Sequence, residues 1–182
     1  MALTDHCDDQ ALRQQLVNVA RRMNSTGLNQ GTSGNLSARI EGGILVTPSS
    51  LPYEQMEADD LVALDLSGHP LREQQRRPSS EWRLHADVLN GRSEAMAVVH
   101  CHPIHATALA CHDRGIPAFH YMVAVAGGDE IRCAPYATFG TKELSENVVE
   151  ALGPRNACLL ARHGMVTLGK DLESALRVAV EV

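Results

Sequence analysis

Two histidines separated by one residue, His100 and His102, follow a short apolar segment at 95–99. This segment predicts a buried β-strand, and side chains along a strand alternate between its two faces. Both imidazoles therefore point to one side, and Cys101 between them points to the other. Two imidazoles on one face supply half of a Zn²⁺ site, but a catalytic zinc needs a third protein ligand and an open position.

The third imidazole is expected from His163, which interrupts two apolar segments at 158–161 and 165–168. These segments predict paired strands, so a polar side chain between them needs a partner. One interpretation is a metal ligand beside the first two histidines. The other is a histidine that is hydrogen-bonded inside the core, and the spacing alone leaves both open.

Glu81 follows Ser79 and Ser80 at the beginning of a predicted helix. The helix dipole favours a carboxylate at this position, so Glu81 can be explained as a first-turn capping acid. The functional interpretation makes it a metal ligand or a general base, because a carboxylate released from zinc by arriving substrate can accept a proton at once.

Three hydroxyl-rich turns could bind an anion without a cluster of basic side chains. They comprise residues 31–35, residues 47–50 and the Ser79-Ser80 pair. The serine pair lies at a helix N-terminus, where backbone N–H groups favour negative charge. Any one of these segments is more often a plain turn, but together with a candidate zinc site they indicate a phosphate pocket built from neutral donors.

The spacing of apolar residues predicts the elements that position these side chains. Helices are expected near 12–23, 82–89, 104–110, 144–152 and 172–179, with Thr141 and Asp171 as N-caps of the last two. Strands are expected near 36–40, 44–47, 61–66, 95–99, 158–161 and 165–168, of which the first two form a hairpin. Strands and helices alternate, but hairpins are interspersed. We therefore expect an α/β fold of three α/β/α layers around a mixed, largely antiparallel central sheet.

The composition is that of a globular protein, with 182 residues, 44% apolar and 21% charged. This length fits a single domain, 1–182. The net charge of −6 and the lack of a long basic run argue against nucleic-acid or anionic-membrane partners. Residues 1–10 lack the pattern of a signal peptide, and no apolar stretch reaches the roughly 18 residues that cross a bilayer. We therefore expect a cytoplasmic protein.

The five cysteines, Cys7, Cys101, Cys111, Cys133 and Cys158, are an odd number without a CxxC pair. This usage is unlike a disulfide framework. The cysteines are expected to be reduced and packed in the core.

Four motifs identify the sequence as similar to the class II aldolase/adducin family. They are Gly27-Leu28-Asn29-Gln30-Gly31-Thr32, Pro78-Ser79-Ser80-Glu81-Trp82-Arg83, Val98-Val99-His100-Cys101-His102 and His163-Gly164. Two further stretches, at 116–122 and 133–141, most resemble the members that act on L-fuculose 1-phosphate. The motifs span nearly the whole chain, which makes the resemblance specific.

The resemblance implies a zinc-dependent aldolase that cleaves a ketose 1-phosphate, similar to L-fuculose 1-phosphate, into dihydroxyacetone phosphate and a small aldehyde. It implies that the zinc ligands are His100, His102, His163 and Glu81, and that Glu81 is also the catalytic acid/base. The phosphate is then expected against Gly34, Asn35, Ser49, Ser50, Ser79 and Ser80. The family pattern further implies a homotetramer with active sites between subunits, where Tyr121 reaches in from a neighbour as a catalytic group and Phe139 lines the aldehyde side.

Two departures from the family pattern bear on the site. Ser50 stands where the L-fuculose 1-phosphate enzymes have glycine, which affects the phosphate loop. Family members also continue past the last predicted helix into a C-terminal tail that helps to close the site. That tail is expected to be missing from this chain, whose sequence stops at Val182.

Several other functions share parts of this chemistry. Breaking a carbon–carbon bond beside a ketone needs a Lewis acid or a Schiff-base lysine, and only Lys142 and Lys170, both in polar contexts, are present for the covalent route. An aldolase for 5-deoxyribulose or 5-methylthioribulose 1-phosphate is the first alternative, differing only in its aldehyde pocket. A methylthioribulose-phosphate dehydratase and a ketose-phosphate 4-epimerase follow, although the family's epimerases typically carry Asp in place of Glu81. A non-catalytic adducin-like module would be free to lose ligands that are all present here.

Overall fold

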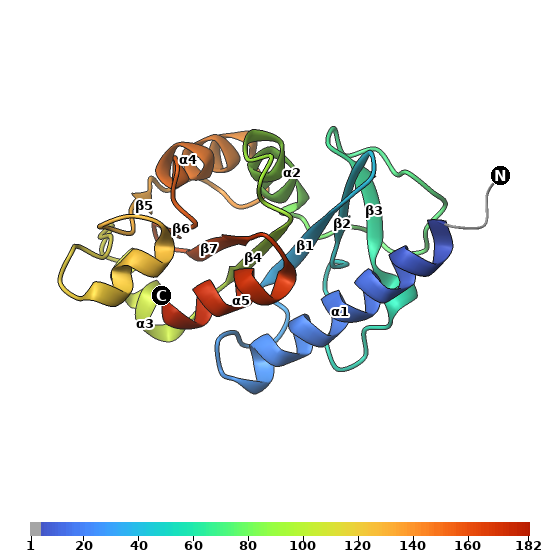
Figure 1. Cartoon of the computed structure of the whole chain (residues 1–182), viewed down its shortest axis with the longest axis horizontal. Helices are drawn as coiled ribbons and strands as arrows, with labels where there is room; N and C mark the ends of the chain where they lie inside the picture. The colour runs from blue at the N-terminus through green and yellow to red at the C-terminus, as the bar shows by residue number, and fades with distance from the viewer. Residues whose placement is uncertain (1–4) are drawn as a thin grey trace.

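The computed structural model describes the backbone of residues 5–182 and the side chains from residue 10 onward (Figure 1). Most of the segment 1–10, for which no signal peptide was predicted, therefore lies outside the residues whose side chains are described. The side chain of Cys7 lies outside them as well. Among the described residues, no helix combines the length and the apolar character that a membrane span requires.

The centre of the molecule is a seven-stranded sheet with the order β3-β2-β1-β4-β7-β6-β5. The strands are β1 (Asn35–Ile40), β2 (Gly43–Val46), β3 (Val62–Asp65), β4 (Ala97–Cys101), β5 (Cys133–Ala134), β6 (Ala157–Leu160) and β7 (Gly164–Gly169). Every neighbouring pair is antiparallel except β5 and β6, which are parallel. The predicted mixed, largely antiparallel sheet is confirmed, and the short strand β5 is an addition to it.

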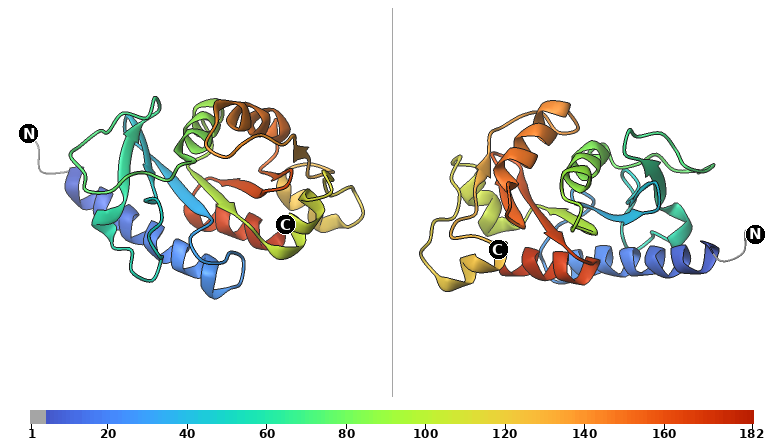
Figure 2. Two further views of the ribbon diagram at one scale, coloured as in Figure 1. Left: turned by 180° about the vertical axis from the view of Figure 1, so that it is seen from behind. Right: turned by 45° about the horizontal axis from the view of Figure 1, so that its top comes forward.

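Helices cover both faces of this sheet. The helices are α1 (Asp5–Ser25), α2 (Trp82–Gly91), α3 (Ile104–Ala110), α4 (Lys142–Leu152) and α5 (Leu172–Glu181), with short 3₁₀ turns η1 (Ala58–Asp60) and η2 (Tyr121–Ala126). In Figure 1, α2 and α4 lie above the sheet and α1 and α5 lie below it, and the turned views in Figure 2 agree. Separate apolar cores fill the two interfaces, so the predicted three-layer α/β/α architecture is confirmed.

The alternation of side chains along β4 decides which layer receives the candidate metal site. Val99 and Cys101 pack in the core shared with α1 and α5, whereas Val98 packs in the core shared with α2 and α4. With a period of two, His100 lies on the same face as Val98 and beneath α2. The prediction that Cys101 points away from the two histidines is confirmed, because its side chain is fully buried in the opposite core.

The predicted helix caps are also present. The Thr141 side chain accepts a hydrogen bond from the Leu144 backbone N–H, and the Asp171 carboxylate accepts one from the Ser174 N–H at 2.6 Å. The prediction for the cysteines holds only in part. All described cysteine side chains are free, and Cys101 and Cys158 are buried, but Cys133 is half-buried and Cys111 is exposed. Cys111 is exposed because it directly follows the short helix α3, at the beginning of a turn.

Candidate functional site

Three histidine side chains from two places in the chain meet above β4. His100 is on the strand, His102 directly follows it, and His163 lies in the turn between β6 and β7. Because β7 pairs with β4, this turn is held beside the end of β4. The possible ligand atoms of the three residues lie within 4.8 Å of one another, and the Nε2 atoms of His100 and His102 are 3.0 Å apart. The structure therefore brings together the three histidines that the sequence singled out.

The hydrogen bonds of His100 determine which of its nitrogens can bind a metal. Its Nδ1 lies 2.9 Å from the carbonyl oxygen of Met165. A carbonyl only accepts, so Nδ1 carries a hydrogen, and Nε2 is the nitrogen that can bind a metal once it gives up its own hydrogen. Nε2 lies 3.0 Å from the Nε2 of His102 and 3.2 Å from a carboxylate oxygen of Glu81. A cation bound among these three atoms would take the place of the hydrogen on His100 Nε2.

Burial and neighbouring charges set the protonation of these imidazoles. Burial, together with the charge of His100, lowers the pKa of His102 and of His163 to about 4 each. Both are therefore neutral near pH 7 and can act as ligands. Burial would also lower the pKa of His100, but the adjacent Glu81 carboxylate outweighs it and raises that pKa. A divalent cation would take the place of this proton.

Glu81 supplies a buried carboxylate to the same cluster. It occupies the N-cap position of α2, but its side chain makes no capping hydrogen bond, so the capping interpretation is wrong. One carboxylate oxygen, Oε2, accepts a hydrogen bond from Asn35 Nδ2 at 2.9 Å. The other, Oε1, lies 3.5 Å from His163 Nε2 and is buried without a hydrogen-bond partner among the described residues. Three imidazoles and a carboxylate with an unsatisfied oxygen form a donor set that fits Zn²⁺.

The carboxylate is ionised, as a ligand or base must be. Burial of Glu81, which is only 5% exposed, would raise its pKa. The opposing charge of His100 and the hydrogen bonds from His100 and Asn35 outweigh burial, so the pKa lies well below its ordinary value. Glu81 is therefore negatively charged throughout the neutral range.

Asn29 and Gly34 hold the backbone around the histidines. The Asn29 side-chain oxygen accepts a hydrogen bond from the His102 backbone N–H at 3.2 Å. A Cβ atom on Gly34 would come within 2.7 Å of the His100 carbonyl oxygen, so this close approach requires glycine. The sequence assigned Gly34 only to phosphate, and the structure gives it a packing function as well.

Two of the three hydroxyl-rich turns lie side by side. The Ser49 N–H donates to the Arg77 carbonyl, and the Ser79 N–H donates to the Thr47 carbonyl, both at 3.0 Å. Ser79 is buried, and its Oγ also accepts from the Glu81 N–H at 3.3 Å. Since the Ser49 and Ser79 amide N–H groups are used inside the loops, these serines have only their hydroxyl groups to offer an anion.

Ser50 and Ser80 are exposed at the same two loops, and the Oγ atoms of Ser49 and Ser50 are 3.3 Å apart. Asn35 approaches from β1, where it is the register partner of His100. All the proposed phosphate residues thus come from segments that adjoin Glu81 or β4.

Tyr121 and Phe139 lie at the surface. Tyr121 begins η2 and is 79% exposed, and Phe139 precedes α4 and is 63% exposed. Within the part of the chain that the structure describes, neither makes a hydrogen bond or ring contact with Glu81 or the three histidines. A contribution of either residue to this cluster remains a prediction.

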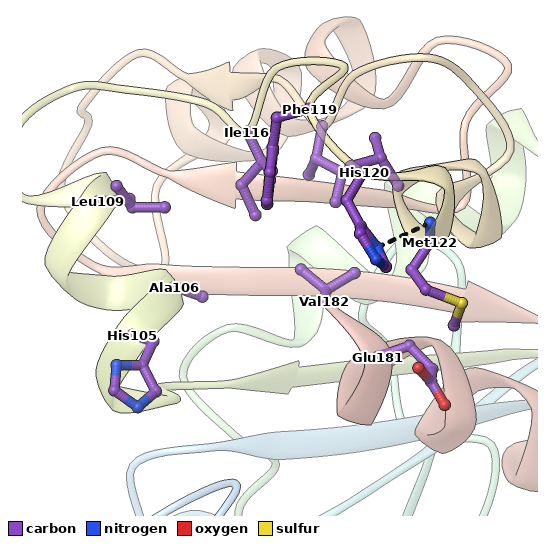
Figure 3. A pocket seen from close by; sticks show the side chains of 11 residues that line it. His105, Ala106, Leu109, Ile116, Phe119, His120, Met122, Glu181 and Val182 are labelled. Carbon is purple, nitrogen blue, oxygen red and sulfur yellow. Dashed lines mark hydrogen bonds between the residues drawn. The ribbon is translucent and has the colours of Figure 1, made fainter.

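A separate cavity of about 220 Å³ lies beside the C-terminal end of α5 (Figure 3). Its lining is mostly apolar, with His120 on one wall and Glu181 on another. Neither Tyr121 nor Phe139 lines it, and neither do the three clustered histidines. This cavity is therefore distinct from the histidine cluster.

Two buried polar residues behind the site were missed by sequence reasoning. His85 in α2 and Ser37 in β1 are both fully buried, and their side chains are hydrogen-bonded to each other. The available pattern was their spacing, since His85 is four residues after Glu81, the N-cap of α2, and Ser37 is two residues after Asn35 on a strand. Each pair therefore shares one face.

Ser50 adopts a backbone conformation that suits glycine, with φ at 58°. The left-handed region costs a side-chain-bearing residue about 1–2 kcal/mol, and glycine loses about 0.5–1 kcal/mol more on folding. We expect Ser50→Gly to raise the free energy of unfolding by about 0.5–1 kcal/mol in denaturant titrations. Ser49→Gly is the matched control, because Ser49 does not have a positive φ, and it should lower the stability. Equal effects of the two substitutions would contradict the strain at Ser50.

Comparisons with known proteins agree with this geometry. The family model described as Class II Aldolase and Adducin N-terminal domain matches residues 14–182. A 5-methylthioribulose-1-phosphate/5-deoxyribulose-1-phosphate aldolase of Rhodospirillum rubrum is 51% identical over 172 residues, covering 94% of this chain and 77% of that protein. An L-fuculose phosphate aldolase of Escherichia coli is 48% identical over 171 residues, covering 94% and 79%.

A solved structure of an L-fuculose 1-phosphate aldolase superposes with a TM-score of 0.90 and 38% identity, covering 94% of this chain and 81% of that one. The resemblance to the L-fuculose 1-phosphate enzymes is confirmed, and an aldolase for a different sugar phosphate is similar to the same degree. Family, relatives and histidine cluster agree on a metal-dependent carbon–carbon lyase. The chain therefore belongs to the class II aldolase and adducin family, and within it to the aldolases.

Proposed function

We propose that this chain is a zinc-dependent aldolase that cleaves a ketose 1-phosphate into dihydroxyacetone phosphate and a small aldehyde. One observation carries the proposal: a buried, ionised Glu81 has an unsatisfied oxygen beside three imidazoles. When bound there by His100, His102, His163 and Glu81, zinc would supply positive charge that stabilises the negative charge developing on the substrate oxygens during cleavage.

The protein's own groups supply proton transfer. Glu81 is ionised and adjoins the expected position of the substrate. In condensation it can accept a proton from the carbon of dihydroxyacetone phosphate that forms the new bond, and in cleavage it can return the proton to that carbon. The covalent alternative has no support from the lysines. Both Lys142 and Lys170 are exposed, and Lys142 pairs with Glu146 at 2.6 Å. Neither amine is enclosed in the apolar pocket that activates a lysine nucleophile.

The remaining site residues complete the proposal. Phosphate is bound by Gly34, Asn35, Ser49, Ser50, Ser79 and Ser80. Tyr121 reaches the active site of a neighbouring subunit in a homotetramer, and Phe139 lines the aldehyde side. The strong exposure of both rings supports this placement, because a side chain that serves a neighbour must project from its own chain.

Two substrates are favoured over others. L-Fuculose 1-phosphate is supported by the motifs and the E. coli relative. A 5-deoxyribulose or 5-methylthioribulose 1-phosphate is supported equally by the R. rubrum relative. Both cleave to dihydroxyacetone phosphate, so they share the metal and phosphate contacts and differ only in the aldehyde.

A panel of aldehydes tests the function and separates the two substrates. Purified, zinc-loaded protein is incubated with dihydroxyacetone phosphate and lactaldehyde, acetaldehyde or methylthioacetaldehyde, and new ketose phosphate is followed by mass spectrometry. Preference for lactaldehyde supports the fuculose substrate, and preference for either of the others supports the alternative. No condensation with any of the three would contradict the aldolase proposal.

Ser79 is expected to contribute to phosphate binding through its hydroxyl group. Its Oγ accepts from the Glu81 N–H, so its own hydrogen is available to an anion. A hydrogen bond to a charged group contributes about 1.5–3 kcal/mol, so Ser79→Ala should raise KM about tenfold or more with a smaller effect on kcat. Steady-state kinetics measures this, and Ser67→Ala in an exposed turn is the control. An unchanged KM in Ser79→Ala would place the phosphate elsewhere.

A further inference from the structure

A second buried histidine, His85, lies behind the metal cluster and is not part of it. It is 0% exposed on α2, in the layer between this helix and the sheet. Both ring nitrogens are hydrogen-bonded: Nδ1 is 2.8 Å from Ser37 Oγ, and Nε2 is 2.5 Å from Asn35 Oδ1. An imidazole in such surroundings is costly unless its polar atoms are paired, and here they are.

The hydrogen bonds run in one direction from Ser37 to Glu81. A carboxylate only accepts, so the Asn35 atom that faces Glu81 is the amide nitrogen, and the amide oxygen faces His85. His85 Nε2 therefore carries the hydrogen. In a neutral ring Nδ1 is then an acceptor, and the Ser37 hydroxyl rotates to donate to it.

The neutral form of His85 follows from its surroundings. Burial, reinforced by the nearby charge of His100, lowers the pKa of His85 to about 3. The ring thus keeps a single N–H over the range in which an aldolase works. Its direction of donation does not change while other groups exchange protons.

The amide of Asn35 has a second hydrogen that the bond to Glu81 does not use. This amide lies between Glu81 and His85, at the first residue of β1 and directly after Gly34, so the second hydrogen can be given to an anion at the proposed phosphate site. Glu81 cannot keep the same hydrogen bond to the Asn35 amide throughout turnover, since Glu81 is itself expected to exchange a proton with the substrate. The hydrogen bond from His85 Nε2–H to Asn35 Oδ1 is the one that persists.

We propose that His85 is a positioning residue that fixes the orientation of the Asn35 amide, so that one N–H is directed to Glu81 and the other to the phosphate of the substrate. The proposal rests on the proposed function, because it assigns the phosphate to Asn35. His85 touches neither substrate nor metal, and it acts only through Asn35.

Two substitutions separate positioning from stability. His85→Leu removes the donor to Asn35, whereas His85→Gln keeps an N–H at about the same place. Ser37→Ala is the matched control, because it removes a buried hydrogen bond of the same imidazole but leaves the donation to Asn35 intact. All three variants lose or weaken a buried contact, so any general destabilisation appears in each as a lower unfolding temperature.

The first measurement is binding of dihydroxyacetone phosphate to the zinc-loaded proteins by calorimetry, with metal content determined in parallel. His85→Leu should keep its zinc and bind about tenfold or more weakly, with KM rising more than kcat falls. His85→Gln should stay within about threefold of wild type, as should Ser37→Ala. Wild-type affinity in His85→Leu, or equal weakening in Ser37→Ala, overturns the proposal.

The second measurement does not depend on any activity. In ¹⁵N-labelled protein, imidazole nitrogen shifts distinguish the Nε2–H tautomer from the Nδ1–H tautomer and from the charged ring. His85 should be neutral and carry its hydrogen on Nε2; a charged ring or the opposite tautomer overturns the proposal even if the protein is an active aldolase. Conversely, a wild-type protein that binds no dihydroxyacetone phosphate contradicts the proposed function and with it this assignment of Asn35, whatever the tautomer.

If His85→Leu fails to fold, the binding affinity of His85→Gln and the tautomer of His85 in the wild-type protein still test the proposal. Glutamine restores the donor but not the ring, so a His85→Gln protein that folds, keeps zinc and binds dihydroxyacetone phosphate tenfold more weakly contradicts positioning through the N–H.

Discussion

A His102→Ala protein is expected to lose its bound zinc and its aldolase activity while keeping its fold. His102 follows β4, and its side chain is half-buried outside both apolar cores, so its removal leaves the packing intact. Loss of a group that only orients a metal ligand costs about 10- to 100-fold in metal affinity or activity. Loss of a ligand itself should cost at least as much. Mass spectrometry after dialysis measures whether the zinc is lost, and circular dichroism measures whether the fold is kept.

His105→Ala is the matched control for this experiment. His105 is three residues further along the chain, in α3, and its side chain is exposed. That variant should keep both its zinc and its activity. If instead the His102→Ala protein retained a full equivalent of zinc after dialysis, the metal site would not be this cluster.

The arrangement of the histidines was accessible from the sequence because it depends on local rules. The period of two along a strand places His100 and His102 on one side, and the apolar segments around His163 predict a turn between strands. Both rules require only neighbouring residues, and the structure follows them. For Glu81 and Asn35 the residues alone left open whether they serve the site or only a helix cap and a turn. The family resemblance favoured the site, since no spacing rule connects residues so far apart in the chain.

What the sequence could not reveal depends on contacts between distant segments. The register that pairs Asn35 with His100 and Ser37 with Val98 places two polar side chains of β1 beneath α2. His85 is then buried against them, although in sequence it resembles an ordinary core position of an amphipathic helix. Strand β5 was missed for a related reason. It has only two residues, too few to show the alternation that marks a strand, and it is a strand only through its pairing with β6.

The same register explains why the carboxylate and the imidazoles are coupled. Glu81 at the beginning of α2 meets His100 on β4 and the Asn35 amide on β1 at one point. Ionised Glu81 is thus held from two sides, by an amide that donates and by nitrogens that would share a cation with it. Such a carboxylate can serve as both ligand and base, and these two functions can be separated by substitution.

Glu81→Gln is expected to keep its zinc and lose turnover. Glutamine has the size and shape of glutamate and offers a weak oxygen ligand, while the three histidines still hold the metal. It cannot accept a proton, and a positioned general base contributes about 10²- to 10⁴-fold to the rate. The loss should fall mainly on kcat, because binding of the phosphate is left intact. Metal analysis and steady-state kinetics on the same preparation measure the two effects.

Proton exchange isolates the step that Glu81 is proposed to perform. Zinc-loaded protein and dihydroxyacetone phosphate are mixed in deuterated water without any aldehyde. NMR then follows the loss of the proton from the carbon of dihydroxyacetone phosphate that would form the new carbon–carbon bond. Wild-type protein should exchange the proton, and so should Glu57→Gln, whose carboxylate lies at η1, remote in sequence from the cluster and largely exposed. Glu81→Gln should exchange it about 10²- to 10⁴-fold more slowly. A Glu81→Gln protein that retained zinc and exchanged at the wild-type rate would assign deprotonation to another group, and Glu81 would then be a metal ligand alone.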